Sequence, residues 1–155
     1  MVDEKVLLVD KESGVATITL NRPDKLNAFN DELSFALQDA LKDCEKDSAV
    51  KVIVVTGAGR GFCSGQDLQA RMESRATAGG ESSKSLGDSL RRRYNPIILK
   101  IRTMEKPIIA SVNGVAAGAG ASLAFACDFR IVSDGVSFIQ SFSKVGLVPD
   151  SGSTF

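Results

Sequence analysis

The chain has 155 residues, of which 43% are hydrophobic and 25% charged, a composition typical of a globular protein that buries one core. Basic and acidic residues number 19 each, so the formal net charge of +0 gives no indication of binding to nucleic acid or to a membrane surface. Histidine is absent, which excludes a Ser/His or Cys/His catalytic pair within these residues, and the three cysteines lack the spacing of metal ligands. The odd cysteine count and the acidic N-terminus without a long apolar stretch predict a cytoplasmic protein with no membrane contact and no metal site.

The first predicted elements are a β-hairpin and a helix. Residues 6–9 and 15–20 are short apolar runs separated by a Glu-Ser-Gly sequence, a pattern typical of two antiparallel strands. A helix is expected to begin after Asn30, whose side chain suits an N-cap and which two acidic residues follow. Its apolar residues recur at helical spacing on one face, namely Leu33, Ala36, Leu37, Ala40, Leu41 and Cys44.

The later elements alternate between strand and helix. Residues 50–55 predict a buried parallel strand, and residues 57–65 the loop that follows it. Residues 72–87 are polar, and we expect them to be the most mobile part of the chain. A helix is predicted over residues 89–102, with Pro96 at a place where it can interrupt the helix. Because strand, helix and strand alternate again after it, the sequence predicts an α/β fold with crossover connections.

Two segments of small residues carry most of the functional information. They are GFCSGQDL at residues 61–68 and NGVAAGAGASLA at residues 113–124. Each follows an apolar run that predicts a strand, at residues 52–55 and 107–112, so each lies where a loop enters a helix. Helix N-termini offer unpaired N–H groups, and small residues let a ligand oxygen approach them. Two such amides that converge on one carbonyl oxygen would form an oxyanion hole.

This pair of motifs closely resembles that of the crotonase superfamily, the enoyl-CoA hydratase/isomerase group. Two further segments are similar to the same family and follow in family order: NRPDKLNAF at residues 21–29, which looks like the segment lining the coenzyme A groove, and ACDFRIVSD at residues 126–134. The resemblance implies a spiral of repeated ββα units. It also implies that residues 1–155 form a partial acyl-CoA-binding core, from which the family's C-terminal helical part is absent.

The resemblance implies specific site residues. The backbone N–H groups of Gln66 and Ala119 match the two oxyanion donors of the family. The family's hydratases use two glutamates to deliver water, and the matching positions here are Ser122 and Phe142. The acid that remains is Asp150, in a segment similar to the isomerase subgroup that includes the ring 1,2-epoxyphenylacetyl-CoA isomerases and enoyl-CoA isomerases. The residues expected to contact coenzyme A are Lys25, Leu26, Ala28, Ser64, Asp67, Leu68, Ala117 and Gly118.

Structural roles remain open for three of these side chains. Asp150 lies in a Pro-Asp-Ser-Gly sequence, which favours a β-turn irrespective of any chemistry. Asp67 has the position of a helix cap, and Lys25 lies in a predicted surface loop, where a lysine is usually solvated.

The resemblance therefore implies an acyl-CoA isomerase that shifts a proton, acting in phenylacetate or fatty acid metabolism. Coenzyme A enters only as part of the substrate, and the full-length protein is expected to form a homotrimer or hexamer. The alternatives are an enoyl-CoA hydratase, which is a lyase, and a non-catalytic member that binds coenzyme A. A nucleotide-binding dehydrogenase is a further alternative, because VIVVTGAGRGF at residues 52–62 places a glycine-rich loop after a strand. That reading lacks a Tyr-x-x-x-Lys pair, since Ile98 follows the only tyrosine, Tyr94, by four residues.

Overall fold

The computed structural model describes residues 5–77, 86–140 and 142–154. The strands are β1 (Leu7–Glu12), β2 (Val15–Leu20), β3 (Val52–Gly57), β4 (Gly61–Cys63), β5 (Ile108–Val112), β6 (Val115–Ala117), β7 (Phe129–Val132) and β8 (Phe138–Ile139). The helices are η1 (Pro23–Lys25), α1 (Asp31–Lys46), α2 (Leu68–Thr77), α3 (Leu86–Ser89), the π-helical turn η2 (Leu90–Tyr94), α4 (Asn95–Thr103), α5 (Ala119–Ala126) and η3 (Phe142–Val145). No helix in these ranges combines the length and apolar character needed to cross a membrane.

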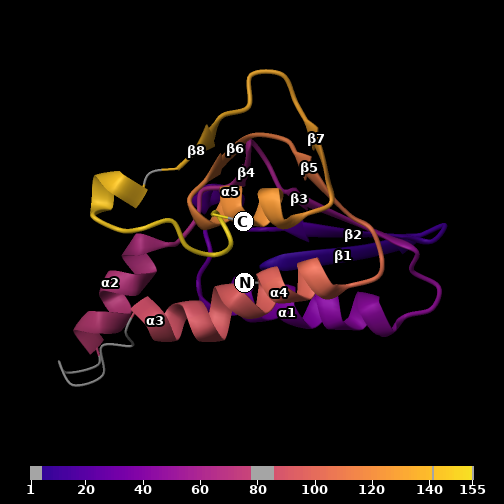
Figure 1. Cartoon of the computed structure of the whole chain (residues 1–155), viewed down its shortest axis with the longest axis horizontal. Helices are drawn as coiled ribbons and strands as arrows, with labels where there is room; N and C mark the ends of the chain where they lie inside the picture. Colours follow the sequence, from indigo (N-terminus) through magenta and orange to yellow (C-terminus); the bar gives the residue numbers. More distant parts are fainter. Residues whose placement is uncertain (1–4, 78–85, 141, 155) are drawn as a thin grey trace.

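Two sheets are built by a repeating pair of strands (Figure 1). The larger sheet has the order β1-β2-β3-β5-β7, and the smaller has the order β4-β6-β8. The first strand of each pair, β3, β5 or β7, joins the larger sheet in parallel, and the second, β4, β6 or β8, joins the smaller sheet in parallel. Each pair thus advances both sheets by one strand, which confirms the predicted α/β fold and its spiral of ββα units.

The hairpin and the first helix confirm their predictions. β1 and β2 are antiparallel, and the turn between them places Ser13 and Gly14 at φ 50° and 85°, the left-handed values that a type I′ turn requires. At the start of α1, the side-chain oxygen of Asn30 accepts a hydrogen bond from the N–H of Leu33 at 2.9 Å. The apolar face of α1 is buried, as its spacing predicts.

The predicted interruption at Pro96 takes the form of a π-helical turn. Proline has no N–H to bond to the carbonyl four residues earlier, and the helix widens just before it in η2. The side-chain amide of Gln38 on α1 donates to the carbonyls of Arg92 and Arg93 at 2.8 and 3.1 Å. The irregular turn is therefore joined directly to α1.

The structure differs from the prediction in two segments. The stretch expected to be a loop at residues 57–65 contains the short strand β4, and α2 extends into the segment expected to be mobile. The central part of that segment, residues 78–85, lies outside the described residues.

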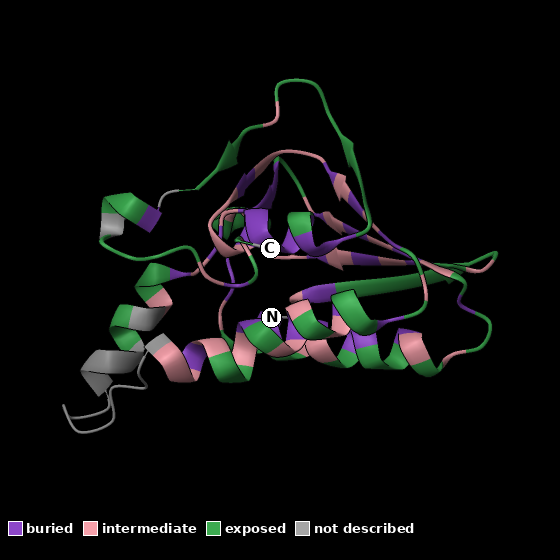
Figure 2. Cartoon of the chain, in the orientation of Figure 1, coloured by how far each residue is buried: buried purple, intermediate pink, exposed green. Residues whose placement is uncertain are grey.

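The helix α5 packs closely against β4. A Cβ atom added to Gly120 would lie 2.1 Å from the carbonyl oxygen of Cys63, so only glycine fits at this point of α5. The helix is buried on almost every side, whereas every residue of β7 and β8 is exposed (Figure 2). The protein therefore has a tightly packed centre and an open edge at the last strand pair.

Candidate active site

The first small-residue segment, residues 61–68, directs the backbone N–H of Gln66 away from the strand-like residue Phe29 that pairs with it. Phe29 forms an isolated parallel bridge with Gln66, donating to the carbonyl of Gly65 at 2.7 Å and accepting from the N–H of Asp67 at 2.9 Å. In a parallel pairing the residue between these two contacts directs its own N–H to the opposite side. The N–H of Gln66 therefore faces away from Phe29.

The second segment supplies an equivalent N–H at the start of α5. Gly118 has φ 48° and ψ −122°, a conformation suited to glycine, and its N–H donates to the carbonyl of Ile139 at 2.9 Å. Ala119 is the first residue of the helix, where an N–H has no acceptor within the helix. Within the described ranges, the N–H groups of Gln66 and Ala119 donate to no other protein group.

Gly65 brings the two segments into contact. It has φ 92°, and a Cβ atom placed on it would lie 2.7 Å from the carbonyl oxygen of Ala117 and 3.4 Å from the backbone nitrogen of Ala119. Because Gln66 follows Gly65 directly, the two unused N–H groups belong to adjacent loops. This is the arrangement from which an oxyanion hole is built.

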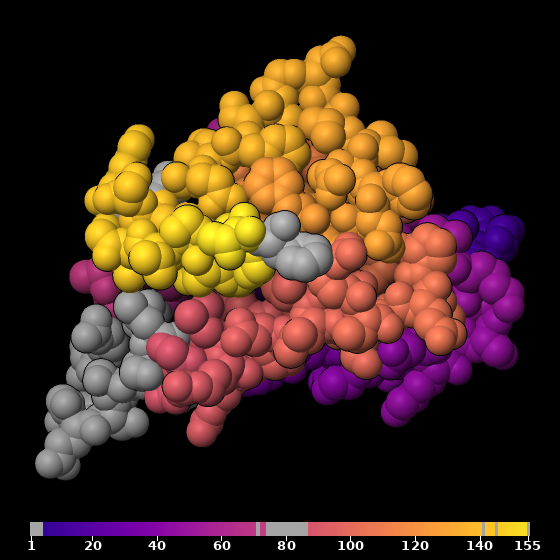
Figure 3. All heavy atoms as spheres, viewed as in Figure 1, coloured from indigo at the N-terminus to yellow at the C-terminus, as the bar shows by residue number. Residues whose placement is uncertain are grey.

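Asp150 begins a tight turn that packs beside α5. Ser151 and Gly152 have φ 50° and 77°, and the N–H of Ser153 donates to the carbonyl of Asp150 at 2.9 Å. A Cβ atom on Gly152 would lie 2.9 Å from the side chain of Ile98 on α4. The space-filling view shows the C-terminal residues lying against this helix (Figure 3). The predicted β-turn is present, with its four residues beginning at Asp150 rather than at the proline before it.

A small apolar cavity connects this turn with the start of α5. It is lined by Phe29, Tyr94, Ile97, Ile98, Ala119, Leu123 and Ser151. The rings of Phe29 and Tyr94 meet edge to face with their centroids 5.8 Å apart. An acyl chain attached to a carbonyl at the Ala119 N–H would thus find an apolar wall beside it.

The segment at residues 21–29 packs against the first small-residue segment, residues 61–68. The buried side chain of Asn27 donates to the carbonyls of Ala58 and Gly61 at 2.9 and 2.8 Å. The N–H of Ser64 donates to the carbonyl of Leu26 at 2.9 Å, and its hydroxyl to that of Lys25 at 3.2 Å. These bonds hold the two predicted coenzyme A segments side by side.

The carboxylate of Asp67 is held by a helix-cap hydrogen bond and an ion pair. One carboxylate oxygen accepts from the N–H of Ala70 at 3.0 Å, and the other pairs with the guanidinium of Arg22 at 2.9 Å. Burial acts to raise the pKa of Asp67, but the Ala70 hydrogen bond and the Arg22 charge outweigh it, so the pKa lies below its ordinary value. The carboxylate is therefore ionised and serves as the cap of α2, the structural role that the sequence left open.

The other residues expected to meet coenzyme A lie around this junction. Lys25 and Leu68 are exposed, Ala28 is buried, and Leu26, Ala117 and Gly118 are partly buried. The amino group of Lys25 donates to the side chain of Gln69 at 3.2 Å. Their contacts with coenzyme A remain predictions.

Neither hydratase position carries an acid or a base. Ser122 is 1% exposed in α5, and Phe142 is buried at the start of η3. The thiol nearest the site, Cys63, is fully buried, and desolvation raises its pKa to about 12, so it is not a nucleophile. Across the described ranges, no group of three or more His, Cys, Asp or Glu side chains is placed to hold a metal ion.

Two polar side chains that support the site were not singled out from the sequence. Arg22 lies 45 residues from its partner Asp67, a separation that no local pattern reveals. Asn113 donates to the carbonyls of Gly57 and Gly59 at 2.8 and 2.9 Å and so fixes the loop before β4. An asparagine between a predicted strand and a glycine was the available signal for this second role.

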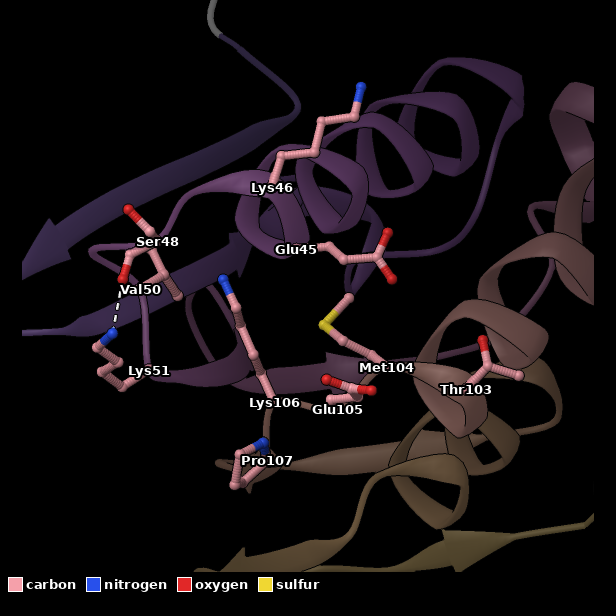
Figure 4. A pocket seen from close by; sticks show the side chains of 10 residues that line it. All are labelled: Glu45, Lys46, Ser48, Val50, Lys51, Thr103, Met104, Glu105, Lys106 and Pro107. Atoms are coloured by element: carbon pink, nitrogen blue, oxygen red, sulfur yellow. Dashed lines mark hydrogen bonds between the residues drawn. The ribbon is translucent and has the colours of Figure 1, made fainter.

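A separate cleft lies at the opposite ends of the strands (Figure 4). It is lined by Glu45, Lys46, Ser48, Val50, Lys51, Thr103, Met104, Glu105, Lys106 and Pro107. The amino group of Lys106 donates to the carbonyls of Cys44 and Asp47, both at 2.6 Å, and so closes the end of α1. The cleft borders the N-terminal ends of β3 and β5, whereas ligands of parallel sheets bind at the C-terminal ends, where both oxyanion segments lie.

Comparison with known proteins identifies the class to which this fold and site belong. A sequence profile of the enoyl-CoA hydratase/isomerase family matches residues 10–155, so the chain belongs to this family of enzymes. It is 46% identical over 149 residues to a 1,2-epoxyphenylacetyl-CoA isomerase of Escherichia coli K12, covering 96% of this chain and 55% of that protein. It is also 36% identical to a short-chain-enoyl-CoA hydratase of Clostridium acetobutylicum, covering 96% of this chain and 54% of that protein.

Comparison with solved structures supports the same family and fold. The crystal structure of an enoyl-CoA hydratase from Polaromonas sp. JS666 matches with a TM-score of 0.82 and 38% identity, covering 94% of this chain and 55% of that one. The chain thus spans about half the length of the relatives it matches. The predicted crotonase-family membership and fold are confirmed, while the relatives include both isomerases and hydratases.

Proposed function

We propose that the protein is an acyl-CoA isomerase that stabilises a thioester enolate between the N–H groups of Gln66 and Ala119. The observation that carries this proposal is the contact of the two segments at Gly65, together with the absence of an acceptor for either N–H group among the described residues. Similarity to the Escherichia coli isomerase supports it. Donors of this kind typically lower the barrier of such a reaction by about 3 kcal/mol each.

The proton is moved by Asp150. The carboxylate accepts a proton from the α or γ carbon of the acyl group, and the electron pair of the broken C–H bond passes to the thioester oxygen as an enolate. The same carboxyl then returns the proton to another carbon of the conjugated system, so no atom is gained or lost. With an epoxide beside the acyl chain, the same enolate would assist opening of the ring to an oxepin.

Hydration is less well supported than isomerisation. Adding water across a double bond requires a group that activates the water, and the two family positions for it hold Ser122 and Phe142. Asp150 alone suits a reaction in which one group both removes and returns a proton.

The remaining expectations are part of the same proposal. Coenzyme A is bound as part of the substrate along the segments that contain Lys25, Leu26 and Ser64, with no separate cofactor. The protein acts in the cytoplasm, on phenylacetyl-type or fatty acyl thioesters, as a trimer or hexamer.

The decisive variant is Asp150→Asn, which keeps the size of the side chain and removes its basicity. We expect it to abolish isomerisation of 3-enoyl and phenylacetyl-type epoxide thioesters while binding of a non-reacting acyl-CoA, measured by calorimetry, stays close to that of the native protein. A matched control, Asp134→Asn, removes a carboxylate from the exposed turn between β7 and β8 and should leave turnover unchanged.

Other outcomes identify the alternatives. Undiminished turnover by Asp150→Asn would remove this residue from the mechanism. Water addition to a 2-enoyl thioester as the main activity would establish a hydratase, and binding without any turnover by the native protein would establish a non-catalytic member.

A further inference from the structure

Two serine hydroxyls join the helix that carries one oxyanion donor to the turn that carries the acid. Ser122 lies three residues after Ala119 on α5, and Ser153 lies three residues after Asp150. Their Oγ atoms are 2.5 Å apart, although 31 residues separate them in the sequence. The contact therefore connects two parts of the site that the chain itself holds far apart.

The direction of this hydrogen bond follows from the distances between the two hydroxyls and their other acceptors. Each serine hydroxyl has one hydrogen to donate. The bond from the Ser153 hydroxyl to the carbonyl of Asp150, at 2.7 Å, is shorter than the 3.2 Å contact of the Ser122 hydroxyl with the carbonyl of Gly118, which favours Ser153 as the donor to Asp150 and Ser122 as the donor to Ser153. The carbonyl of Gly118, 3.2 Å from the Ser122 hydroxyl, already accepts the N–H of Ser122 at 3.0 Å. A single chain of hydrogen bonds thus runs from α5 through Ser153 to the backbone of Asp150.

A third serine fixes the carboxylate itself. The hydroxyl of Ser151 donates to Oδ1 of Asp150 at 2.9 Å, and Ser151 is only 5% exposed. Its φ of 50° is unfavourable for a residue other than glycine. The bond to Oδ1 leaves Oδ2 as the oxygen better placed to exchange a proton.

We propose that Ser122 and Ser153 are a positioning pair that sets the place of Asp150 relative to the oxyanion hole. The inference rests on the proposed function, because it concerns the placement of the acid named there. The strands β7 and β8, which precede this turn, are exposed, and the turn also packs on Ile98 through Gly152 and lines the small apolar cavity through Ser151. The hydroxyl pair thus supplies a polar link between α5 and the turn that carries the acid.

The pair is tested by Ser122→Ala, Ser153→Ala and the double variant, with kcat measured on the best isomerisation substrate. Small errors in the placement of a reacting group are costly, so each single variant should lower kcat by about tenfold to a hundredfold. Because both substitutions remove the same hydrogen bond, the loss of kcat in the double variant should be no larger than the loss in the less active of the two single variants. Affinity for a non-reacting acyl-CoA should stay unchanged, and Ser153→Thr, which keeps the hydroxyl, should retain most of kcat.

Controls separate positioning from stability and from failure of the mechanism. Ser143→Ala removes an exposed hydroxyl from η3 and should leave kcat unchanged. Urea unfolding of each variant shows whether it is folded under the assay conditions. Unchanged kcat in both single variants, or losses that multiply in the double variant, would overturn the positioning pair. Full activity of Asp150→Asn would overturn the proposed function itself, whereas loss of activity in Asp150→Asn with unchanged kcat in the serine variants would overturn only the positioning pair.

Discussion

The first two strand pairs of the spiral differ from the third in what they give to the site. The pairs β3–β4 and β5–β6 end in the segments of Gln66 and Ala119, and each supplies a backbone N–H from the packed interior. The pair β7–β8 is exposed and leads to Asp150, which supplies a side chain. It is joined to the interior through the pairing of β7 with β5 and of β8 with β6, and through the stacked rings of Phe125 and Phe138, whose centroids are 5.2 Å apart.

This difference separates the two kinds of group in the proposed mechanism, backbone donors and a side-chain acid. A backbone donor cannot be removed by truncating a side chain. Its geometry depends instead on the close approach of neighbouring backbone segments, which the absence of a Cβ atom at Gly65 and Gly120 allows. The acid can be removed by changing one residue, and its position depends on hydrogen bonds between side chains. Substitutions that add atoms should therefore damage the interior part of the site, and substitutions that remove them should damage the edge.

Among substitutions outside Asp150, the largest effect is expected from Gly65→Ala. The new methyl group would meet the carbonyl oxygen of Ala117 at 2.7 Å and force the two oxyanion loops apart. Losing the alignment of one donor typically costs about a hundredfold to a thousandfold in kcat, and we expect a loss of this size in steady-state assays.

Gly135→Ala is the matched control for this substitution. Gly135 also has a positive φ, 76°, but a Cβ atom on it would meet nothing within 4 Å. Both variants place an alanine at a positive φ and bear the strain of that backbone conformation, but only Gly65→Ala is expected to separate the loops. Equal kcat values for the two variants would show that contact between the loops is unimportant for catalysis.

A smaller effect, on stability, is expected from Asp67→Asn. The amide oxygen can still cap α2, but the charge facing Arg22 is lost, which should lower the free energy of unfolding by about 1 to 3 kcal/mol. Urea unfolding at neutral pH measures this difference.

The difference should depend on pH in a definite direction. Because the folded protein lowers the pKa of Asp67, its ionised form stabilises the fold at pH values above the unfolded pKa of about 3.9. That contribution is lost as the pH falls through the lower pKa of the folded state. The stability gap between the native protein and Asp67→Asn should therefore narrow on acidification, and a gap that widened would contradict the assigned ion pair.

The regular elements could be predicted because their patterns are local. The spacing from Leu33 to Cys44 defines the buried face of α1, Asn30 defines its start, and Pro96 marks the irregular turn. The positions of Gln66 and Ala119 followed from the resemblance of two glycine-rich motifs to those of the crotonase superfamily. β4 was missed because three residues are too few to show alternation. The start of α2 after Asp67 was expected, but its length was not, because the sequence of the helix is mostly polar.

The supporting contacts of the site could not be predicted in the same way. Arg22 with Asp67 and Ser122 with Ser153 are pairs that only the folded chain brings together, 45 and 31 residues apart. Asp67 illustrates the consequence. Its motif position favoured both a ligand contact and a helix cap, and only the positions of Arg22 and Ala70 show the cap.

The central claim is that two backbone N–H groups meet at one thioester oxygen, and an infrared spectrum tests it without turnover. A non-reacting acyl-CoA labelled with ¹³C at its carbonyl reports the strength of the hydrogen bonds to that oxygen. Two preorganised donors should move the carbonyl stretch of the bound thioester below its frequency in water, in the native protein and in Asp150→Asn but not in Gly65→Ala. A bound thioester that absorbs at its solution frequency would contradict the account.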